Sequence, residues 1–415
     1  MQCSNSGWVF AADTAVVLQP MRSRLKKQRS NRAATLCENS PHAPRTARRR
    51  EPTAPLMDST DRTAYFNLLE PAGLIAKFLA APPQDFSTGS TAEGTPYFVA
   101  KFDLLTTMEP AAKQRITKLP FYRHWGEWLK PVTCFVGTTV TEYAPLPSGI
   151  DAASLVARIK ADFARRYAFL IVKDTPQDSP LLPTESNAAS ASFVDACRQA
   201  GFVLLEGQAL AYVTIDFAST DEYLARLSSG RRKDIRRKLR STAELDIETV
   251  PTGDARFADA AVRAEFYALF LNVYNQSELH FDLLTADFFD AILLDASNGG
   301  VVFVYRHEGR VIGFNLCYVC GGNLVDKYVG FVYPQARELN LYFVSWMHNL
   351  DYALQHGLKH YIAGWTDPEI KSYLGAKFTF TRHAVYVRNP VLRAILRRFS
   401  GAFESDRAVM QAKSP

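Results

Sequence analysis

The chain has 415 residues, of which 47% are hydrophobic and 22% charged, so it can bury a large core and is long enough for two domains. Its net charge is +6, but the first 57 residues hold ten basic and three acidic side chains, and the remainder is nearly neutral. This argues against a general nucleic-acid-binding surface on the folded part. No apolar run reaches the roughly 18 residues that a membrane-spanning helix needs, so we expect no membrane span.

Residues 1–57 mix Arg with Pro, Ser, Asn and Thr without a period, which predicts a disordered basic tail. Its apolar piece contains Asp13 and has no positive segment before it, so a secretory signal is not expected. Met57 is an alternative start of translation, and a transit peptide is a second interpretation of the tail.

The six cysteines follow the reduced usage of cytosolic chains, and we expect a cytoplasmic protein. The one close pair, Cys317 and Cys320, lies in a strand-like run where residues three apart point to opposite faces. No second pair completes a set of four zinc ligands, so we expect no metal site.

The first half reads as short strands and helices. We predict strands at 98–105, 134–144 and 167–174, and a helix at 151–166. The polar stretch 175–190, "TPQDSPLLPTESNAAS", predicts a linker or long loop. It suggests a boundary between a half at 58–190 and a half at 191–400.

The second half has a clearer order. Helices are predicted at 191–200, 220–243, 255–274 and 285–296, with strands at 202–217 and 245–250. Tight-turn residues at 308–309 and 321–322 join three antiparallel strands at 301–307, 310–320 and 323–330. A long helix at 336–356, a strand at 360–364, a helix at 368–376, a strand at 378–387 and a final basic helix from 390 complete a mixed, α+β arrangement.

Four stretches resemble a known family: "SSGRRKDIRRKLR" at 228–240, "VYNQSELHFDLLT" at 273–285, "LVDKYVGFVYPQARELNLYF" at 324–343 and "AGWTDPEIKSYLGAKFTFTRHAVYVRNP" at 363–390. With the order of elements, they resemble the Fem-like branch of the GNAT acyltransferases. The resemblance implies two GNAT-like mixed sheets in tandem with flanking helices. It also implies acyl transfer from acyl-CoA, or aminoacyl transfer from charged tRNA to a cell-wall precursor.

The helix at 231–240 is unusually basic, with seven cations and one acid in ten residues. Such density is costly unless anions or acidic side chains face it. We predict that Arg236 and Arg237 contact the phosphates of a donor. The alternative is a solvated helix face paired with nearby acids.

The stretch 324–343 runs from a strand into a helix. Strand alternation predicts that Asp326 and Tyr328 share one face of the sheet while Lys327 takes the other. The helix start that follows predicts an anion site for the donor, built from the free amides near Gln335 and Ala336 and from the Arg337 side chain; a simple surface turn is the alternative.

Acyl transfer to an amine needs a base for the amine and a proton for the leaving group. Tyr328 is our candidate proton donor, Glu338 a base acting through water, and Asp326 a second carboxylate. His280 is an alternative base and Glu278, from the same polar loop, a substrate contact. Trp365 and Lys371 are predicted to contact substrate, although capping residues at 366–369 explain that helix start equally well.

The leading hypothesis is therefore an N-acyltransferase that moves an acyl group from acyl-CoA, acetyl-CoA or longer, to a small-molecule amine or cell-wall precursor. The alternatives are aminoacyl transfer with a tRNA partner, which the near-neutral body disfavours, and a non-catalytic protein that binds CoA or another anion. The acceptor, the acyl chain length and the oligomeric state cannot be read from the sequence.

Overall fold

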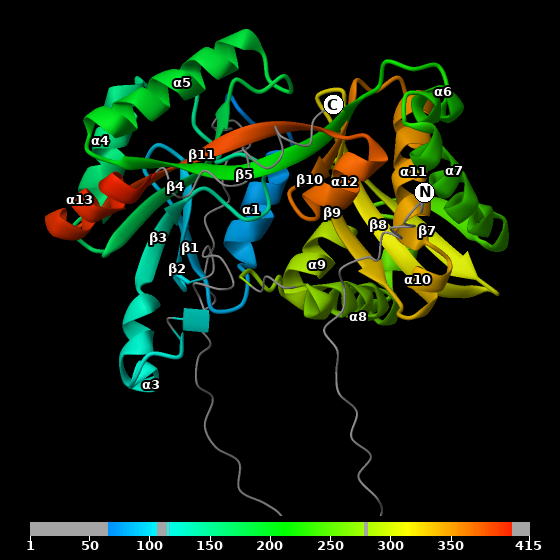
Figure 1. The fold of residues 1–415 in the computed structure, drawn as a ribbon. Coiled ribbons are helices and arrows are strands. Elements are labelled where there is room, and N and C mark those ends of the chain that lie inside the picture. Colours follow the sequence, from blue (N-terminus) through cyan, green and yellow to red (C-terminus); the bar gives the residue numbers. More distant parts are fainter. Residues whose placement is uncertain (1–64, 106–113, 116, 278–280, 401–415) are drawn as a thin grey trace, which may run out of the picture. The chain divides into compact units, whose positions relative to one another are not determined.

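The computed structural model describes residues 65–105, 114–115, 117–277 and 281–400 (Figure 1). The predicted basic tail, with Met57, lies outside the described residues, and so do the candidates Glu278 and His280. These described residues form one compact unit.

One eleven-stranded mixed sheet organises this unit. Its strand order is β1-β2-β3-β4-β11-β5-β10-β9-β8-β7-β6, so the last strand of the chain pairs between β4 and β5 in the middle of the sheet. The pairs β3–β4 and β9–β10 are parallel, and the other neighbours are antiparallel. The strands are β1 (Ser87–Ser90), β2 (Pro96–Lys101), β3 (Val132–Val136), β4 (Phe169–Gln177), β5 (Val203–Thr214), β6 (Asp246–Pro251), β7 (Gly300–His307), β8 (Arg310–Cys320), β9 (Asn323–Phe331), β10 (His360–Gly364) and β11 (Lys377–Val387).

The predicted β7–β8–β9 meander is confirmed. Both turns have positive φ at their two central residues, Glu308 and Gly309 in the first and Gly321 and Gly322 in the second. This backbone matches the twist of the flanking strands and fixes the register of each hairpin. The meander then leads into the parallel partner β10 through a helical crossover.

Helices cover both faces of the sheet. On one face, α1 (Gly73–Ala80), α8 (Ala260–Gln276) and α9 (Ala286–Leu293) share a core with strands of both the early and the late parts of the chain. The other face carries α4 (Ala152–Phe163) and α5 (Thr184–Gln199) over β3 and β4. Over β7 to β10 that face carries α6 (Thr220–Ala225), α7 (Ser229–Lys238), α10 (Gln335–Glu338), α11 (Leu341–Gln355) and α12 (Pro368–Leu374).

The remaining elements are short or peripheral. They are α3 (Tyr122–Trp125), η1 (Gly126–Leu129), η2 (Leu239–Glu244), η3 (Ala255–Ala258) and α13 (Pro390–Phe399). Helix α13, at the red end of the colour bar, contacts β11 and β5 (Figure 1). None of the described helices is long and apolar enough to cross a bilayer.

The predicted linker at 175–190 is wrong. Strand β4 extends to Gln177, and α5 begins at Thr184, so only six residues between them are irregular. The Pro and Ser content misled because prolines are tolerated before a helix start and α5 follows Pro183 directly. The two predicted halves contribute to one continuous sheet, and their division at residue 190 stays a prediction.

Three other elements differ from the sequence reading. The strand predicted at 134–144 ends at Val136, and a buried irregular segment follows. The helix predicted at 220–243 divides into α6, α7 and η2. The helix predicted at 336–356 divides into α10 and α11, because Asn340 adopts a left-handed conformation (φ 50°) that ends the first piece.

Candidate functional site

Strands β9 and β10 stop pairing while both still continue. Their parallel register covers only three residue pairs and ends at Val325 opposite Ile362. We call the unpaired stretch beyond this point, Asp326 and Lys327 of β9 with Ala363 and Gly364 of β10, the strand fork. Where neighbouring strands separate in the middle of a sheet, the backbone groups between them need partners other than the facing strand.

Each strand of the fork also has a β-bulge where it pairs with its other neighbour, which is β8 for β9 and β5 for β10. The β8–β9 register shifts so that Cys317 pairs with Asp326 but Leu316 pairs with Tyr328, which leaves Lys327 as the extra residue. The β5–β10 register shifts in the same way around Ala363. Bulges bend the strands that carry them and re-aim side chains, and they are common beside functional sites.

The bulge overturns the predicted distribution of side chains along β9. Asp326 faces α11, whereas Tyr328 lies in the opposite core with helices α8 and α9. Lys327 and Tyr328 share that second face, because one inserted residue breaks the alternation. The prediction that Asp326 and Tyr328 lie together is therefore wrong.

Asp326 is buried in a hydrogen-bond network. Its Oδ1 accepts from Asn315 Nδ2 at 2.6 Å, and its Oδ2 accepts from Tyr361 Oη at 2.8 Å and from Asn349 Nδ2 at 3.3 Å. Burial raises the pKa of Asp326, against the lowering effect of the hydrogen bonds from Tyr361 and Asn315. Both carboxylate oxygens have donors, so the side chain is held in one orientation.

Lys371 of α12 reaches the fork from the same side. Its side chain is buried, and its Nζ donates to the carbonyl oxygen of Ala363 at 2.6 Å. A Cβ placed on Gly364 would lie 3.9 Å from that Nζ and 4.0 Å from the Asp326 carbonyl oxygen. Burial lowers the pKa of Lys371 to about 8, although Asp326 opposes the shift. A lysine with this pKa exchanges its proton near neutral pH.

The other face of the fork holds a buried ion cluster. Lys327 Nζ lies 2.7 Å from Glu142 Oε1 and 3.2 Å from Glu70 Oε1, and the Glu142 amide donates to Glu70 Oε1 at 2.6 Å. Although burial disfavours its charge, the two glutamates raise the pKa of Lys327. Sequence reasoning missed both glutamates, because no local pattern links Lys327 to residues so far away in the chain.

Tyr328, predicted as a proton donor, lies beside this cluster. Its ring packs against Phe270, Phe288 and Phe289, and its hydroxyl has no hydrogen-bond partner in the described structure. Burial raises the pKa of Tyr328 well above its ordinary value, so the proton stays on the oxygen. Trp365, a predicted substrate contact, packs against a small core that includes Tyr143 and Val325.

The turn after β9 differs from the predicted anion site. The amides of Ala336, Arg337 and Glu338 already donate to the carbonyls of Val332 and Pro334, so the expectation that they are free is wrong. Helix α10 is only four residues long, because the chain closes into a tight turn there.

The side chains of this turn point outward. Arg337 donates to Gln276 Oε1 at 2.8 Å and lies over the Tyr333 ring, and Glu338 is exposed. Helix α10 packs through Ala336 in the α11-side core, on the opposite face of the sheet from Tyr328. The structure therefore does not bring Glu338 and Tyr328 together.

Helix α7 presents a basic concavity of about 390 Å³. Its lining comprises Ser229, Arg232, Lys233, Arg236, Arg237 and Arg240. The two predicted phosphate contacts are paired at the surface, Arg236 with Asp221 at 2.8 Å and Arg237 with Asp234 at 2.7 Å. No ion pair or hydrogen bond engages the side chains of Lys233 and Arg240 anywhere in the described chain. These two cations are therefore available to a ligand.

The α7 region borders the elements that form the fork. Tyr373 of α12 donates to Asp234 at 2.9 Å, and Ser241 of η2 donates to the carbonyl of Leu339 at the α10–α11 junction. Ile235 of α7 is fully buried in the core that also contains Ala363. The basic concavity thus lies next to the helix that carries Lys371.

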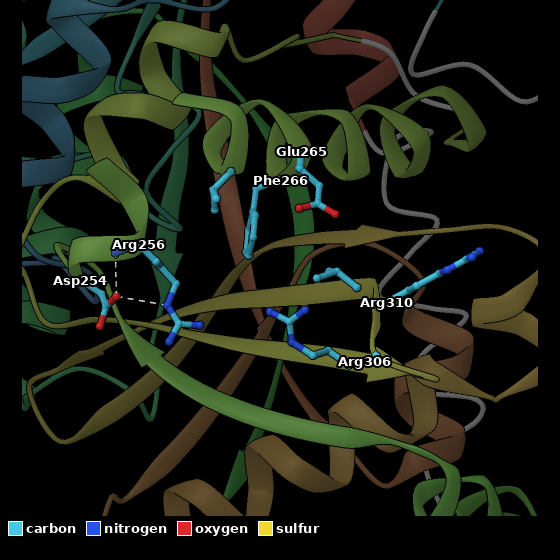
Figure 2. A pocket seen from close by; sticks show the side chains of 9 residues that line it. Asp254, Arg256, Glu265, Phe266, Arg306 and Arg310 are labelled. Atoms are coloured by element: carbon cyan, nitrogen blue, oxygen red, sulfur yellow. Dashed lines mark hydrogen bonds and ion pairs between the residues drawn. The ribbon is translucent and has the colours of Figure 1, made fainter. Parts of the chain in front are cut away.

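A second groove, of about 690 Å³, contains none of the predicted site residues (Figure 2). Arg256, Arg306 and Glu265 approach it from η3, β7 and α8, and Arg310 points away from it in this view. Glu248 and Asp254 hold Arg256, so much of its charge is compensated inside the protein. Among the described residues, no group of three or more His, Cys, Asp or Glu is arranged to hold a metal ion.

Sequence comparison identifies the family. Residues 170–414, more than half of the chain, match the family model FemAB-like, described as peptidoglycan biosynthesis and recognition. The chain belongs to the FemAB-like family. The match includes β4 and β5 and every later element, and so contains Asp326, Lys327, Tyr328 and Lys371, while Glu70 and Glu142 precede it. No curated protein sequence matched.

Solved structures with a similar arrangement include GNAT-fold proteins. The C-terminal domain of a putative lysylphosphatidylglycerol synthetase from Agrobacterium fabrum is 14% identical, with a TM-score of 0.46 over 77% of this chain and 88% of that one. FemX is 12% identical, with a TM-score of 0.43 over 78% and 98%. A tandem GNAT protein from the clavulanic acid biosynthesis pathway is 12% identical, with a TM-score of 0.37 over 77% and 89%.

Proposed function

We propose that this FemAB-like protein is an N-acyltransferase that moves an acyl group from acyl-CoA to an amine at the strand fork. The observation that carries the proposal is the fork itself, where pairing ends between two central strands beside a buried lysine whose pKa lies near 8. Unpaired backbone and an ionisable group matched to neutral pH are what a group-transfer site needs.

The chemistry can be assigned to the residues of the Asp326 face. The amine nitrogen forms a bond to the thioester carbonyl carbon, the carbon–sulfur bond breaks, and the amine loses one proton while the thiolate gains one. Protonated Lys371 is the proposed donor to the thiolate, because its pKa of about 8 is close to that of a thiol. The Asp326 carboxylate, which three hydrogen bonds hold in place, provides negative charge next to the Lys371 ammonium group.

The basic concavity of α7 is the proposed site for the donor's phosphates. CoA carries several negative charges on its nucleotide end, and Lys233 and Arg240 are unpaired cations on the concavity that borders α12. Arginine and lysine side chains bind phosphates through charge-assisted hydrogen bonds. In this proposal Arg236 and Arg237 exchange their surface partners for phosphate, and Arg337 stays with Gln276.

Calorimetry with acetyl-CoA and with acetyl-pantetheine, which lacks the nucleotide, tests this assignment. We expect Lys233→Ala/Arg240→Ala to weaken acetyl-CoA binding about tenfold and to leave acetyl-pantetheine binding unchanged. Arg198→Ala, which removes a surface arginine of α5 paired with Asp195, is the matched control and should bind like wild type. Indifference of the wild-type protein to every CoA ester would exclude this donor.

A second donor, charged tRNA, is favoured by one observation. Five cationic side chains line the α7 concavity, and a run of tRNA backbone phosphates would meet several of them at once. In that case the bond that breaks is the ester between the aminoacyl group and the tRNA. Retention of charged tRNA that falls steeply with salt, and falls further in Lys233→Ala/Arg240→Ala, would select this donor over acyl-CoA.

The proposed acceptor is an amine on a cell-wall precursor. The family description concerns peptidoglycan, and FemX and the lysylphosphatidylglycerol synthetase domain are structures of similar arrangement. A muropeptide with one free primary amine is the simplest probe, and acylation of that amine is read by the mass of the product. Binding of CoA esters and charged tRNA without any product would favour a non-catalytic binding protein.

A further inference from the structure

The Lys327 face of the fork contains two carboxylates that share one cation. Glu70 and Glu142 are 2% exposed, and each uses its Oε1 to accept from Lys327. Two acids and one lysine leave a net negative charge in the interior when all three are ionised. Buried charge of one sign is expensive unless a partner compensates it.

Several polar atoms of this cluster have no partner. Glu70 Oε2, Glu142 Oε2 and Tyr328 Oη are all buried without a hydrogen bond. Buried polar atoms are almost always paired, so an unpaired group calls for a bound molecule or another specific cause. Three such atoms in one region, two of them carboxylate oxygens, indicate a site for a hydrogen-bond donor with positive charge.

The cluster lies at the fork because a small core holds it there. Leu69 and Tyr143, the neighbours of the two glutamates in sequence, pack with Val325 and Ile362, the last paired residues of β9 and β10. Lys327 follows at the β9 bulge. The two carboxylates thus border the fork on the face opposite Asp326.

We propose that Glu70, Glu142 and Tyr328 bind the ammonium group of a primary amine, the acceptor of the transfer reaction. Only the role of this amine as acceptor rests on the proposed function. The ammonium site itself is inferred from the residues of the cluster. A primary ammonium has three N–H donors, which match two carboxylate oxygens and one hydroxyl oxygen. A quaternary ammonium has no N–H donor and an alcohol has no charge, so neither satisfies the site.

The environment also suits release of the ammonium proton. Burial raises the pKa of Glu70, against the opposing effect of Lys327, and burial raises the pKa of nearby Asp282 as well. A carboxylate with a raised pKa takes up a proton more readily than an exposed one. The amine nitrogen would then carry the lone pair that forms the new bond.

Binding of n-butylammonium to the full-length protein without a donor tests the site. We expect calorimetry to detect n-butylammonium and to detect neither n-butanol nor tetramethylammonium. Glu142→Gln keeps the shape of the side chain and should weaken binding about tenfold or more, because it removes the charge. Glu127→Gln is the matched control, since Glu127 pairs with Lys130 at 2.8 Å on the surface; it should bind like wild type.

A second variant, Tyr328→Phe, tests the site in case Glu142→Gln does not fold. It removes one unpaired hydroxyl and leaves the ring packing, so the fold should stay intact while binding weakens several-fold. Equal binding by wild type, Glu142→Gln and Tyr328→Phe would overturn the proposal, and so would a wild-type protein that binds no primary ammonium, in which case the cluster holds water. Because this experiment contains no acyl donor, it tests the binding site alone. Amine binding here, followed by no transfer once acetyl-CoA or charged tRNA is added, would contradict the proposed function and leave the binding site standing.

Discussion

The two faces of β9 at the fork differ in how completely their buried carboxylates are hydrogen-bonded. On one face, each oxygen of Asp326 accepts a hydrogen bond from a fixed side chain. On the other, Glu70 and Glu142 share Lys327 and each leaves one oxygen unpaired. The paired oxygens fix the Asp326 carboxylate in place, although Asn349 Oδ1 in its network has no partner, whereas the unpaired oxygens of Glu70 and Glu142 leave hydrogen-bonding capacity for a ligand.

Removing the shared cation should have the largest effect on stability. Lys327→Met leaves two buried carboxylates without their counter-ion, and we expect a loss of about 3–5 kcal/mol in the free energy of unfolding. Urea denaturation at neutral pH measures it. Lys130→Met, which breaks the exposed pair with Glu127, should leave the midpoint unchanged. A loss no greater than that of the control would mean that the interior cluster is solvated.

Lys371 should make stability depend on pH. Its folded-state pKa of about 8 lies below its ordinary value of 10.5. Between these values the unfolded chain binds the proton and the folded chain does not, so stability rises with pH and then levels off. The rise should be roughly 3 kcal/mol.

Urea denaturation of wild type and Lys371→Met at several pH values from about 7.5 to 10.5 isolates this effect. The difference between the two proteins removes the contributions of other titrating groups. The negative charges of Asp326, Glu142 and Asp367 act on Lys371 and oppose the lowering of its pKa. A constant difference across this range would show that Lys371 titrates normally. Under the proposed mechanism, the transfer rate of wild type should also fall as pH rises through about 8.

The smallest expected effect comes from removing one tyrosine hydroxyl on each face of β9 at the fork. Tyr361→Phe removes a hydroxyl that donates to Asp326 and accepts from Asn349, and we expect it to cost about 1–3 kcal/mol. Tyr328→Phe removes a buried hydroxyl without a partner, so stability should stay the same or increase slightly. Thermal denaturation of both variants measures the contrast, and a large loss in Tyr328→Phe would reveal a partner for that hydroxyl.

The sequence predicted the β7–β8–β9 meander well because its signals are local. The two turns have residues that accept positive φ, and apolar side chains fill the strands between them. The helix at 336–356 was predicted in one piece because its apolar period continues through Asn340, and the left-handed break depends on the packing of the turn. Periodicity reports the faces of an element but not a local interruption.

The site was harder to predict for a similar reason. Lys371 and Asp326 carry chemistry on recognisable elements, and the sequence singled out both. A single bulged residue then moved Tyr328 to the other face, and alternation cannot reveal such an insertion. Glu142 and Glu70 lie 185 and 257 residues before Lys327, on segments without a motif, so only the folded chain shows that they meet.

The most direct test of acyl transfer at the fork is the mass spectrum of a muropeptide with one free primary amine after incubation with the protein and acetyl-CoA. The account predicts one acetyl group on that amine, a raised KM for the muropeptide in Glu142→Gln, and a lowered kcat in Lys371→Arg, whose guanidinium keeps its proton. Wild-type protein that leaves the amine unmodified with every acyl-CoA and every charged tRNA would contradict it.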